Sequence, residues 1–293
     1  MSAPPRAAPA GADIRRIRLD AGGITLSGLL ARPTGPPRPG GANRPVVLAV
    51  HGRSMRADYF HARTHPDLSL LDVAVARGHT VVALDRPGYG ASAERLPEGQ
   101  TVDEQSATVH AALRSFSADH AARAGFVVLA HSHGGKLALR LAADDSAGRI
   151  RGLDISGCGV EYSAAARGLP SSLGAGASRL NWGPLRLYPP GTFQQARSLL
   201  APTPPREDGE WLRWPHQYRD LAPRVRVPVR FTFADHEAWW RLGDSDLAEL
   251  AGALTAAPRV GVHRHPDAGH NISLGWSARA YHLRALEFLE ACR

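Results

Sequence analysis

Ser132 stands in a sequence pattern that is typical of an activated serine. It is the centre of Ala130-His131-Ser132-His133-Gly134, so the residues two before and two after it are small. The apolar run FVVLA precedes it and the helical pattern GGKLALRLAADD follows, which places Ser132 where a strand turns into a helix. A turn this sharp strains the backbone of the nucleophile and leaves room only for small neighbours. The pattern therefore predicts a nucleophilic hydroxyl, with an inert turn serine as the alternative.

The helix after Ser132 is placed to stabilise negative charge. Its positive end and free N–H groups face any oxyanion that develops on a substrate, and the N–H of His133 is one candidate donor. In VVLAVHGRSM, a second apolar run, VVLAV, is followed by His51 and Gly52, which close the predicted strand. We expect the backbone N–H of Arg53 to supply the second donor, and we interpret His51 as a strand-end residue bonded to the backbone.

Apolar runs near residues 46, 80, 126, 151 and 229 predict the strands of a parallel sheet. These runs show no alternation of apolar and polar residues, as in strands buried on both faces. Residues 259–266 predict one further strand, and an antiparallel hairpin is expected around Gly22-Gly23. Helical patterns cover about 58–77, 102–124, 134–145, 243–256 and 275–291. The predicted fold class is α/β, a mostly parallel twisted sheet flanked by helices.

The interval 160–222 breaks this rhythm and predicts an inserted cap, because it is long, weakly periodic and rich in Gly, Pro, Ser and Arg. We expect residues 13–159 and 223–293 to form the core, and the Pro/Ala-rich residues 1–12 to form a disordered tail. Aromatic residues of a cap can pack on one another or form the walls of a substrate pocket. The candidates for the pocket walls are Trp182, Tyr188, Trp211 and, beyond the cap, Trp239.

The serine turn, the HGR loop and LDRPGYGAS (residues 84–92), in this order and spacing, resemble the α/β-hydrolase family. The resemblance runs from about residue 14 to the C-terminus, with the cap matching only as a variable insertion. It implies a triad in the chain order nucleophile, acid, histidine. It also implies that His270, in the Gly-His pair of HPDAGHNIS, is the base that accepts the proton of Ser132.

The acid of the implied triad has more than one candidate. FTFADHEAWW offers Asp235 and Glu237 after a predicted strand. Relatives commonly carry Gly-x-x-Asp there, and Ala234 stands at the glycine position, so the resemblance favours Glu237. Asp235 is the alternative acid, and Asp154 is a third candidate.

These residues predict a serine hydrolase that cleaves an ester or thioester of a small, largely apolar substrate through an acyl-enzyme on Ser132. Esters and thioesters are preferred to amides because no device for protonating a poor amine leaving group is evident. One alternative is an acyltransferase or cyclase of natural-product tailoring that uses the same triad. Another is a non-catalytic ligand-binding protein with this fold. The acyl group is expected on a small molecule or on a carrier protein, and the oligomeric state is left open.

Composition and the absence of certain motifs argue against several other classes of protein. The net charge is +8, from 35 basic and 27 acidic residues, but no basic block predicts nucleic-acid binding. No run approaches the ~18 apolar residues of a membrane span. Two cysteines and no signal-peptide pattern predict a cytoplasmic protein. The sequence contains no G-x-G-x-x-G or P-loop motif, so no nucleotide cofactor is predicted. The pairs His61 and His65, and His263 and His265, lack a third ligand, so no metal site is predicted.

Overall fold

The computed structural model of the protein describes residues 12–34, 44–120, 122–169 and 175–292. The tail expected at residues 1–12 lies outside the described residues, except for Ala12, which begins the first strand. The strands are β1 (Ala12–Asp20), β2 (Thr25–Pro33), β3 (Val46–Val50), β4 (Val81–Leu84), β5 (Phe126–His131), β6 (Ile150–Ser156), β7 (Val229–His236) and β8 (Val260–Gly269). The α-helices are α1 (Leu70–Ala76), α2 (Val102–His120), α3 (His133–Asp144), α4 (Ala164–Arg167), α5 (Ala175–Trp182), α6 (Thr192–Leu199), α7 (Glu210–Leu221), α8 (Asp244–Gly252) and α9 (Ala278–Glu290).

In the described residues, the strands form one eight-stranded sheet in the order β1-β2-β4-β3-β5-β6-β7-β8. β1 and β2 pair as an antiparallel hairpin, and β2 joins β4 antiparallel. The remaining pairs, from β4 through β3 to β8, are parallel. The turn of the hairpin uses Gly22 and Gly23 at φ angles of 74° and 88°, which glycine adopts without a steric penalty. The sheet and its hairpin confirm the predicted fold class.

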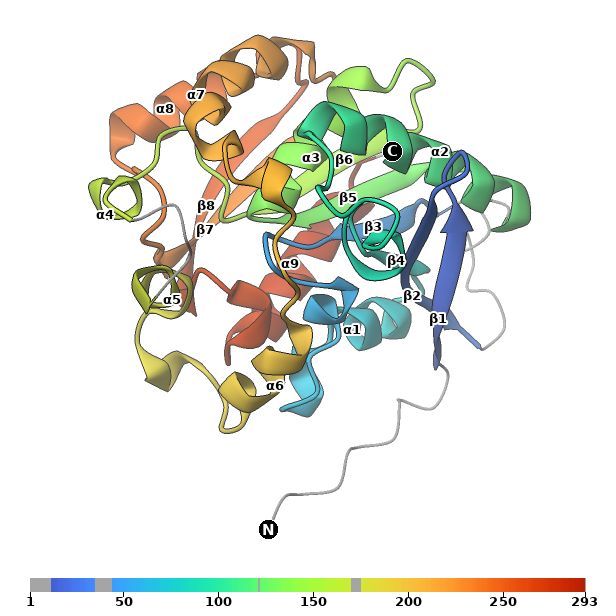
Figure 1. Cartoon of the computed structure of the whole chain (residues 1–293), viewed down its shortest axis with the longest axis horizontal. Coiled ribbons are helices and arrows are strands. Elements are labelled where there is room, and N and C mark those ends of the chain that lie inside the picture. The colour runs from blue at the N-terminus through green and yellow to red at the C-terminus, as the bar shows by residue number, and fades with distance from the viewer. Residues whose placement is uncertain (1–11, 35–43, 121, 170–174, 293) are drawn as a thin grey trace.

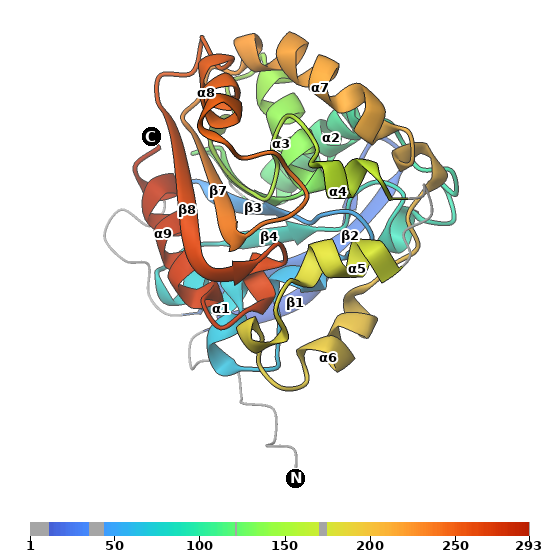
Figure 2. The same ribbon diagram turned by 90° about the vertical axis from the view of Figure 1, so that its left-hand side faces the viewer.

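The sheet is buried on both faces, which explains the unbroken apolar runs of its central strands. In β3, Val46, Leu48 and Val50 belong to the hydrophobic core on one face, which also contains residues of α2 and α3. The alternate residues Val47 and Ala49 belong to the core on the other face, with residues of α1 and α9. Figures 1 and 2 show these helices on the two sides of the sheet.

The prediction of a single helix over residues 58–77 is wrong. Short 3₁₀ turns at Ala57–Phe60 and Pro66–Leu68 precede α1, which begins only at Leu70. Pro66 opens the second turn, where its missing N–H costs no hydrogen bond, and the Ser69 side chain caps α1. Pro66 therefore divides the range that was predicted as one helix, and only its last part forms an α-helix.

The helices α4 to α7 come from the interval that was predicted to be a cap, and they give no strand to the sheet within its described residues. Figure 2 shows α4, α5 and α6 on the side of the molecule away from α9. Three 3₁₀ turns lie between and after these helices: Leu185–Leu187, Pro205–Glu207 and Ala222–Arg224. The division into core and cap remains a prediction; below, "cap segment" means the described residues of 160–222.

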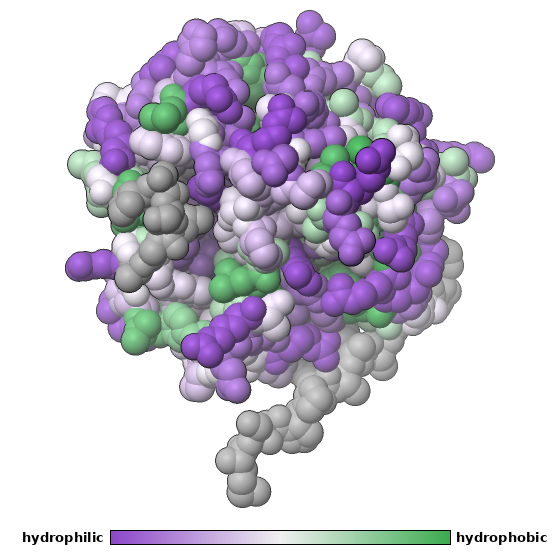
Figure 3. All heavy atoms as spheres, viewed as in Figure 1, coloured by the Kyte–Doolittle hydropathy of each residue, from purple (hydrophilic) through white to green (hydrophobic). Residues whose placement is uncertain are grey.

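The surface drawn in Figure 3 is mainly hydrophilic, with hydrophobic residues in small, separate groups. Among the described residues, no helix combines the length and the apolar character that a bilayer crossing requires. Cys158 and Cys292 are both buried and free of disulfide bonds.

Candidate active site

Ser132 lies at the turn between β5 and α3 with a strained backbone. Its φ of 53° and ψ of −120° are rare for a residue with a side chain. The turn leaves little space around it: a Cβ on Gly134 would lie 2.4 Å from the carbonyl oxygen of Val50, and one on Gly52 would lie 3.1 Å from Cβ of Ser132. The small residues around Ser132 therefore have a steric reason, as the sequence pattern predicted.

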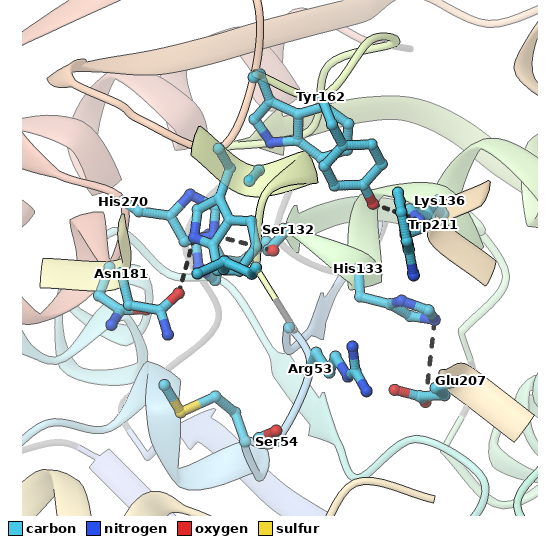
Figure 4. Close-up of a pocket in the computed structure, with 18 of the residues that line it drawn as sticks. Arg53, Ser54, Ser132, His133, Lys136, Tyr162, Asn181, Glu207, Trp211 and His270 are labelled. Atoms are coloured by element: carbon cyan, nitrogen blue, oxygen red, sulfur yellow. Dashed lines mark hydrogen bonds and ion pairs between the residues drawn. The ribbon is translucent and has the colours of Figure 1, made fainter. Parts of the chain in front are cut away.

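The structure brings His270 and Glu237 to Ser132. His270 follows β8, and its Nε2 lies 3.0 Å from Ser132 Oγ (Figure 4). Its Nδ1 lies 2.7 Å from Glu237 Oε2, just beyond β7. A carboxylate only accepts hydrogen bonds, so Nδ1 carries the proton and Nε2 is free to accept one from the serine hydroxyl. The side chains of His270 and Glu237 are 3% and 0% exposed, which keeps water from competing for this contact.

Gly157, which follows β6, makes room for the His270–Glu237 pair. Its φ is 60°, and a Cβ there would lie 2.9 Å from His270 Cε1 and 3.2 Å from Glu237 Oε2. Its carbonyl oxygen accepts a hydrogen bond of 2.7 Å from Nε1 of Trp240. The sequence analysis did not identify this glycine, because its importance arises from a contact across the sheet.

The other two acid candidates make different contacts. Asp235 is exposed and accepts hydrogen bonds from the backbone N–H groups of Asp267 and Ala268, at 2.9 and 3.0 Å, so it ties the end of β7 to β8. Its partial burial alone would raise its pKa, but these N–H groups outweigh burial and lower the pKa. Asp154 is buried against Arg230, with Nε to Oδ2 at 2.5 Å. Only Glu237, of the three candidates, contacts His270.

Two more histidines pack close to the site. His51 bonds only to the backbone, as expected: its Nδ1 donates to the Gly52 carbonyl, and its Nε2 accepts from the N–H of Arg86. Burial lowers the pKa of His51 to about 3, so its ring is neutral. His131 stacks on Tyr59 at 4.8 Å, and burial, together with nearby His270, lowers its pKa well below the usual range.

The candidate oxyanion donors flank Ser132 on two sides. The N–H of His133 is the first of α3 and has no acceptor within the helix. Arg53 follows Gly52, which packs directly against Ser132. The guanidinium of Arg53 forms an ion pair with Asp208 of the cap segment.

A family model described as the alpha/beta hydrolase family matches residues 46–282, most of the chain. The chain belongs to the alpha/beta hydrolase family. No curated protein matches this alpha/beta hydrolase significantly in sequence.

Several solved structures are similar to this alpha/beta hydrolase over nearly the whole chain. A cold-adapted esterase from an Arctic intertidal metagenomic library is 19% identical, with 96% of this chain and 94% of that chain covered and a TM-score of 0.58. A monoacylglycerol lipase of Paleococcus ferrophilus is 15% identical, with coverages of 96% and 100% and a TM-score of 0.62. An AqdC variant, solved with its substrate, the Pseudomonas quinolone signal, is 17% identical, with coverages of 94% and 99% and a TM-score of 0.65. At these identities the similarity shows the fold alone.

A pocket opens at Ser132, and the cap segment of this alpha/beta hydrolase supplies much of its wall. Of the predicted wall residues, Trp211 and Trp239 line it. Trp182 and Tyr188 do not, which corrects their prediction. They pack on each other at 5.2 Å and against Gly269, where a Cβ would lie 2.3 Å from the Tyr188 hydroxyl. A Cβ on Gly269 would also lie 2.4 Å from the backbone carbonyl oxygen of Trp182, so the Tyr188 side chain and the Trp182 backbone fill the space beside Gly269.

The sequence analysis missed several residues of the pocket wall. Lys136, Tyr162 and Asn181 all line it, and Nζ of Lys136 donates a hydrogen bond of 2.9 Å to the Tyr162 hydroxyl. Lys136 is placed there by helical spacing, since residues four apart lie on one face of a helix. That spacing after Ser132 was a signal that could have found it.

A buried ion pair joins the cap segment to the loop beside Ser132. Arg86, after β4, binds Glu207 with Nη1 to Oε1 at 2.5 Å, and both side chains are fully buried. The same guanidinium donates to the carbonyl oxygens of His51 and Gly52, at 3.0 and 3.3 Å. Tyr89 donates a further hydrogen bond to Glu207 at 2.9 Å. Burial alone would raise the pKa of Glu207, but Arg86 lowers it to about 2.

In the described residues, no third potential metal ligand lies with either of the histidine pairs considered above. His61 and His65 lie at the ends of 3₁₀ turns and not on one helix, contrary to the prediction. Within the described ranges, no group of three or more His, Cys, Asp or Glu residues is placed to hold a metal ion.

Proposed function

We propose that this protein is a serine hydrolase that cleaves an ester or thioester of a small, largely apolar substrate through an acyl-enzyme on Ser132. The single observation that carries the proposal is the chain of contacts from Ser132 Oγ to His270 Nε2, and from Nδ1 to Glu237. Such a chain lets the imidazole accept the serine proton as the hydroxyl attacks a carbonyl.

Each residue has a definite part in the proposed reaction. Ser132 Oγ bonds to the acyl carbon while Nε2 of His270 takes its proton, and Glu237 stabilises the imidazolium without accepting the proton. The N–H groups of His133 and Arg53 donate to the oxyanion, each worth roughly 100 to 1,000-fold in rate. His270 then protonates the leaving group, and water attacks the acyl-enzyme by the reverse of the same steps.

A fluorophosphonate probe tests the proposal, because it phosphonylates an activated serine. We expect one covalent adduct on the peptide that contains Ser132, no adduct in Ser132→Ala, and hydrolysis of nitrophenyl acetate only by the wild type. Ser156 provides a matched control: it is a buried serine one strand away whose Oγ bonds to His131. Labelling that persists in Ser132→Ala, or that depends on Ser156, would contradict the proposal.

A further inference from the structure

Lys136 is a buried cation in the wall of the pocket. It is the sole lysine in the sequence, it is 2% exposed, and it lies one helical turn after Ser132. Its Nζ lies 5.1 Å from the ring centre of Trp214 and 5.5 Å from that of Tyr162, so aromatic rings flank the ammonium. One of its three N–H groups is donated to the Tyr162 hydroxyl, which leaves two.

The charge of this ammonium is not balanced by an ion pair. Across residues 12–34, 44–120, 122–169 and 175–292, no carboxylate oxygen lies within 4.0 Å of its Nζ. The two carboxylates that act on it form ion pairs elsewhere, Glu207 with Arg86 and Glu210 with Arg213, and Oε2 of Glu210 is buried without a hydrogen-bond partner among the described residues. A buried charge without an ion-pair partner is costly, and an anionic ligand in the pocket would offset that cost.

The groups that face Nζ set its protonation. Burial lowers the pKa of Lys136 to about 8, while the carboxylates of Glu210 and Glu207 act to raise it and the guanidinium of Arg53 acts to lower it. Burial raises the pKa of the Cys158 thiol to about 12, so the thiol is neutral near pH 7. The amine is therefore mostly a cation at neutral pH.

Two other buried nitrogen atoms of this wall make no hydrogen bond to the described part of the chain: Nε of Arg53, whose Nη2 pairs with Asp208, and Nε2 of His133. Oε1 of Glu207 lies 3.9 Å from His133 Nε2, beyond hydrogen-bonding distance. Burial lowers the pKa of His133 well below the usual range, so its ring is neutral. Both residues line the pocket, and Figure 4 shows them with Lys136 on the side of Ser132 opposite His270. This wall thus offers a ligand the two free N–H groups of Lys136 and the Nε–H of Arg53, while Nε2 of the neutral His133 ring donates only in the tautomer that carries the proton there.

We propose that the pocket selects esters whose acyl part carries a carboxylate, which binds the ammonium of Lys136 at the end of the pocket away from His270. The acyl part is specified because His270 must reach the leaving group to protonate it, which leaves the opposite side for the acyl chain. The inference rests on the proposed ester-cleaving function and narrows its substrate class to half-esters of dicarboxylic acids.

The first test compares charged and neutral esters of equal length. The substrates are monomethyl succinate, adipate and suberate, each paired with the methyl ester of the corresponding half-amide. For the best pair we expect a higher kcat/KM for the anion. In Lys136→Met we expect the anion-to-neutral ratio to fall by about 30-fold or more, the loss typical of removing one partner from a buried charge pair. Arg167→Met is the control, because it removes an exposed cap cation and should preserve the ratio.

The second test needs no change at Lys136. Lysine labelled with ¹³C at Cε gives one protein signal, because the chain has one lysine. In Ser132→Ala, which cannot turn the ester over, we expect monomethyl adipate to raise the pKa reported by this signal, since an anion stabilises the ammonium. The neutral half-amide ester should leave that pKa in place.

The outcomes separate this inference from the proposed function. Equal kcat/KM for charged and neutral esters, with no shift of the lysine signal, would overturn the carboxylate site while leaving an ester hydrolase. If the wild type hydrolyses no ester and takes no fluorophosphonate, the proposed function fails, and the lysine signal in Ser132→Ala still decides whether the pocket binds a carboxylate.

Discussion

Replacing Glu237 by glutamine tests the proposed triad most directly. Oε1 of Glu237 accepts a hydrogen bond of 2.9 Å from the backbone N–H of Trp239, while Oε2 faces Nδ1 of His270. In Glu237→Gln the amide oxygen would remain at the Trp239 N–H, because the amide nitrogen cannot accept a hydrogen bond. The NH₂ group would then face Nδ1 and force the ring proton onto Nε2, where it blocks transfer from Ser132.

The expected loss of kcat in Glu237→Gln has two causes, the missing carboxylate charge and the changed tautomer of His270. An anion about 4 Å from the imidazolium stabilises it by about 4 kcal/mol at an effective dielectric constant of about 20. Losing that stabilisation in the transition state slows the reaction about 1,000-fold. The wrong tautomer accounts for losses of about 10⁴ where the same carboxylate-to-amide change has been made in a serine protease. We therefore expect kcat to fall between about 10³ and 10⁴-fold.

The assay is the hydrolysis of nitrophenyl acetate, with Asp235→Asn as the matched control. Asp235 binds two backbone N–H groups and does not contact His270. Its replacement should cost about 1 to 3 kcal/mol of unfolding free energy and less than about tenfold in kcat. The assignment of Glu237 is refuted if folded Glu237→Gln stays within tenfold of wild type, or if Asp235→Asn is the slower enzyme.

Two further predictions concern residues that support the site. Gly157→Ala should lower kcat/KM by about 100-fold, because its Cβ would displace His270. Gly148→Ala is its control in the same nitrophenyl assay, since it has a similar φ of 62° and nothing within 4 Å, so equal losses would refute the steric reason. Glu207→Gln should cost about 3 to 5 kcal/mol at pH 7, measured by urea unfolding. Because Arg86 holds the folded pKa of Glu207 near 2, below the ordinary 4.5, this stability is present above pH 4.5 and lost as the pH falls toward 2. Between pH 4.5 and 2, the unfolding free energy of Glu207→Gln should therefore fall less than that of the wild type. An identical fall in both proteins would contradict the assignment of the low pKa to Glu207.

The sequence predicted those parts of the fold that depend on local patterns. Each central strand appeared as an apolar run because both of its faces are buried, and the turn at Ser132 appeared because sterics require small neighbours. The helix over residues 58–77 failed because Pro66 and the Ser69 cap outweighed its apolar spacing.

The contacts of the candidate site were predictable where a motif places a residue at a strand end, as for Ser132 and His270, whereas only the resemblance favoured Glu237 over Asp235. The site was not predictable where contacts join distant segments. Nothing local distinguishes Trp211, which lines the pocket, from Trp182, which packs on Tyr188. Gly157 likewise gains its importance only from the side chains that meet above it.

Arg86 shows why the cap segment and the loop at residues 51–53 cannot be treated as independent parts. Its guanidinium binds Glu207 of the cap segment and, at the same time, the carbonyl oxygens of His51 and Gly52. Arg53, the proposed oxyanion donor, directly follows Gly52, so its backbone is oriented by the same ion pair that seats the cap segment. A loosened Glu207 should consequently disturb the reacting end of the pocket as well as its walls. The cap segment in this hydrolase is thus expected to influence kcat, and not only the affinity for substrate, because Arg86 binds both Glu207 and the loop that ends at Arg53.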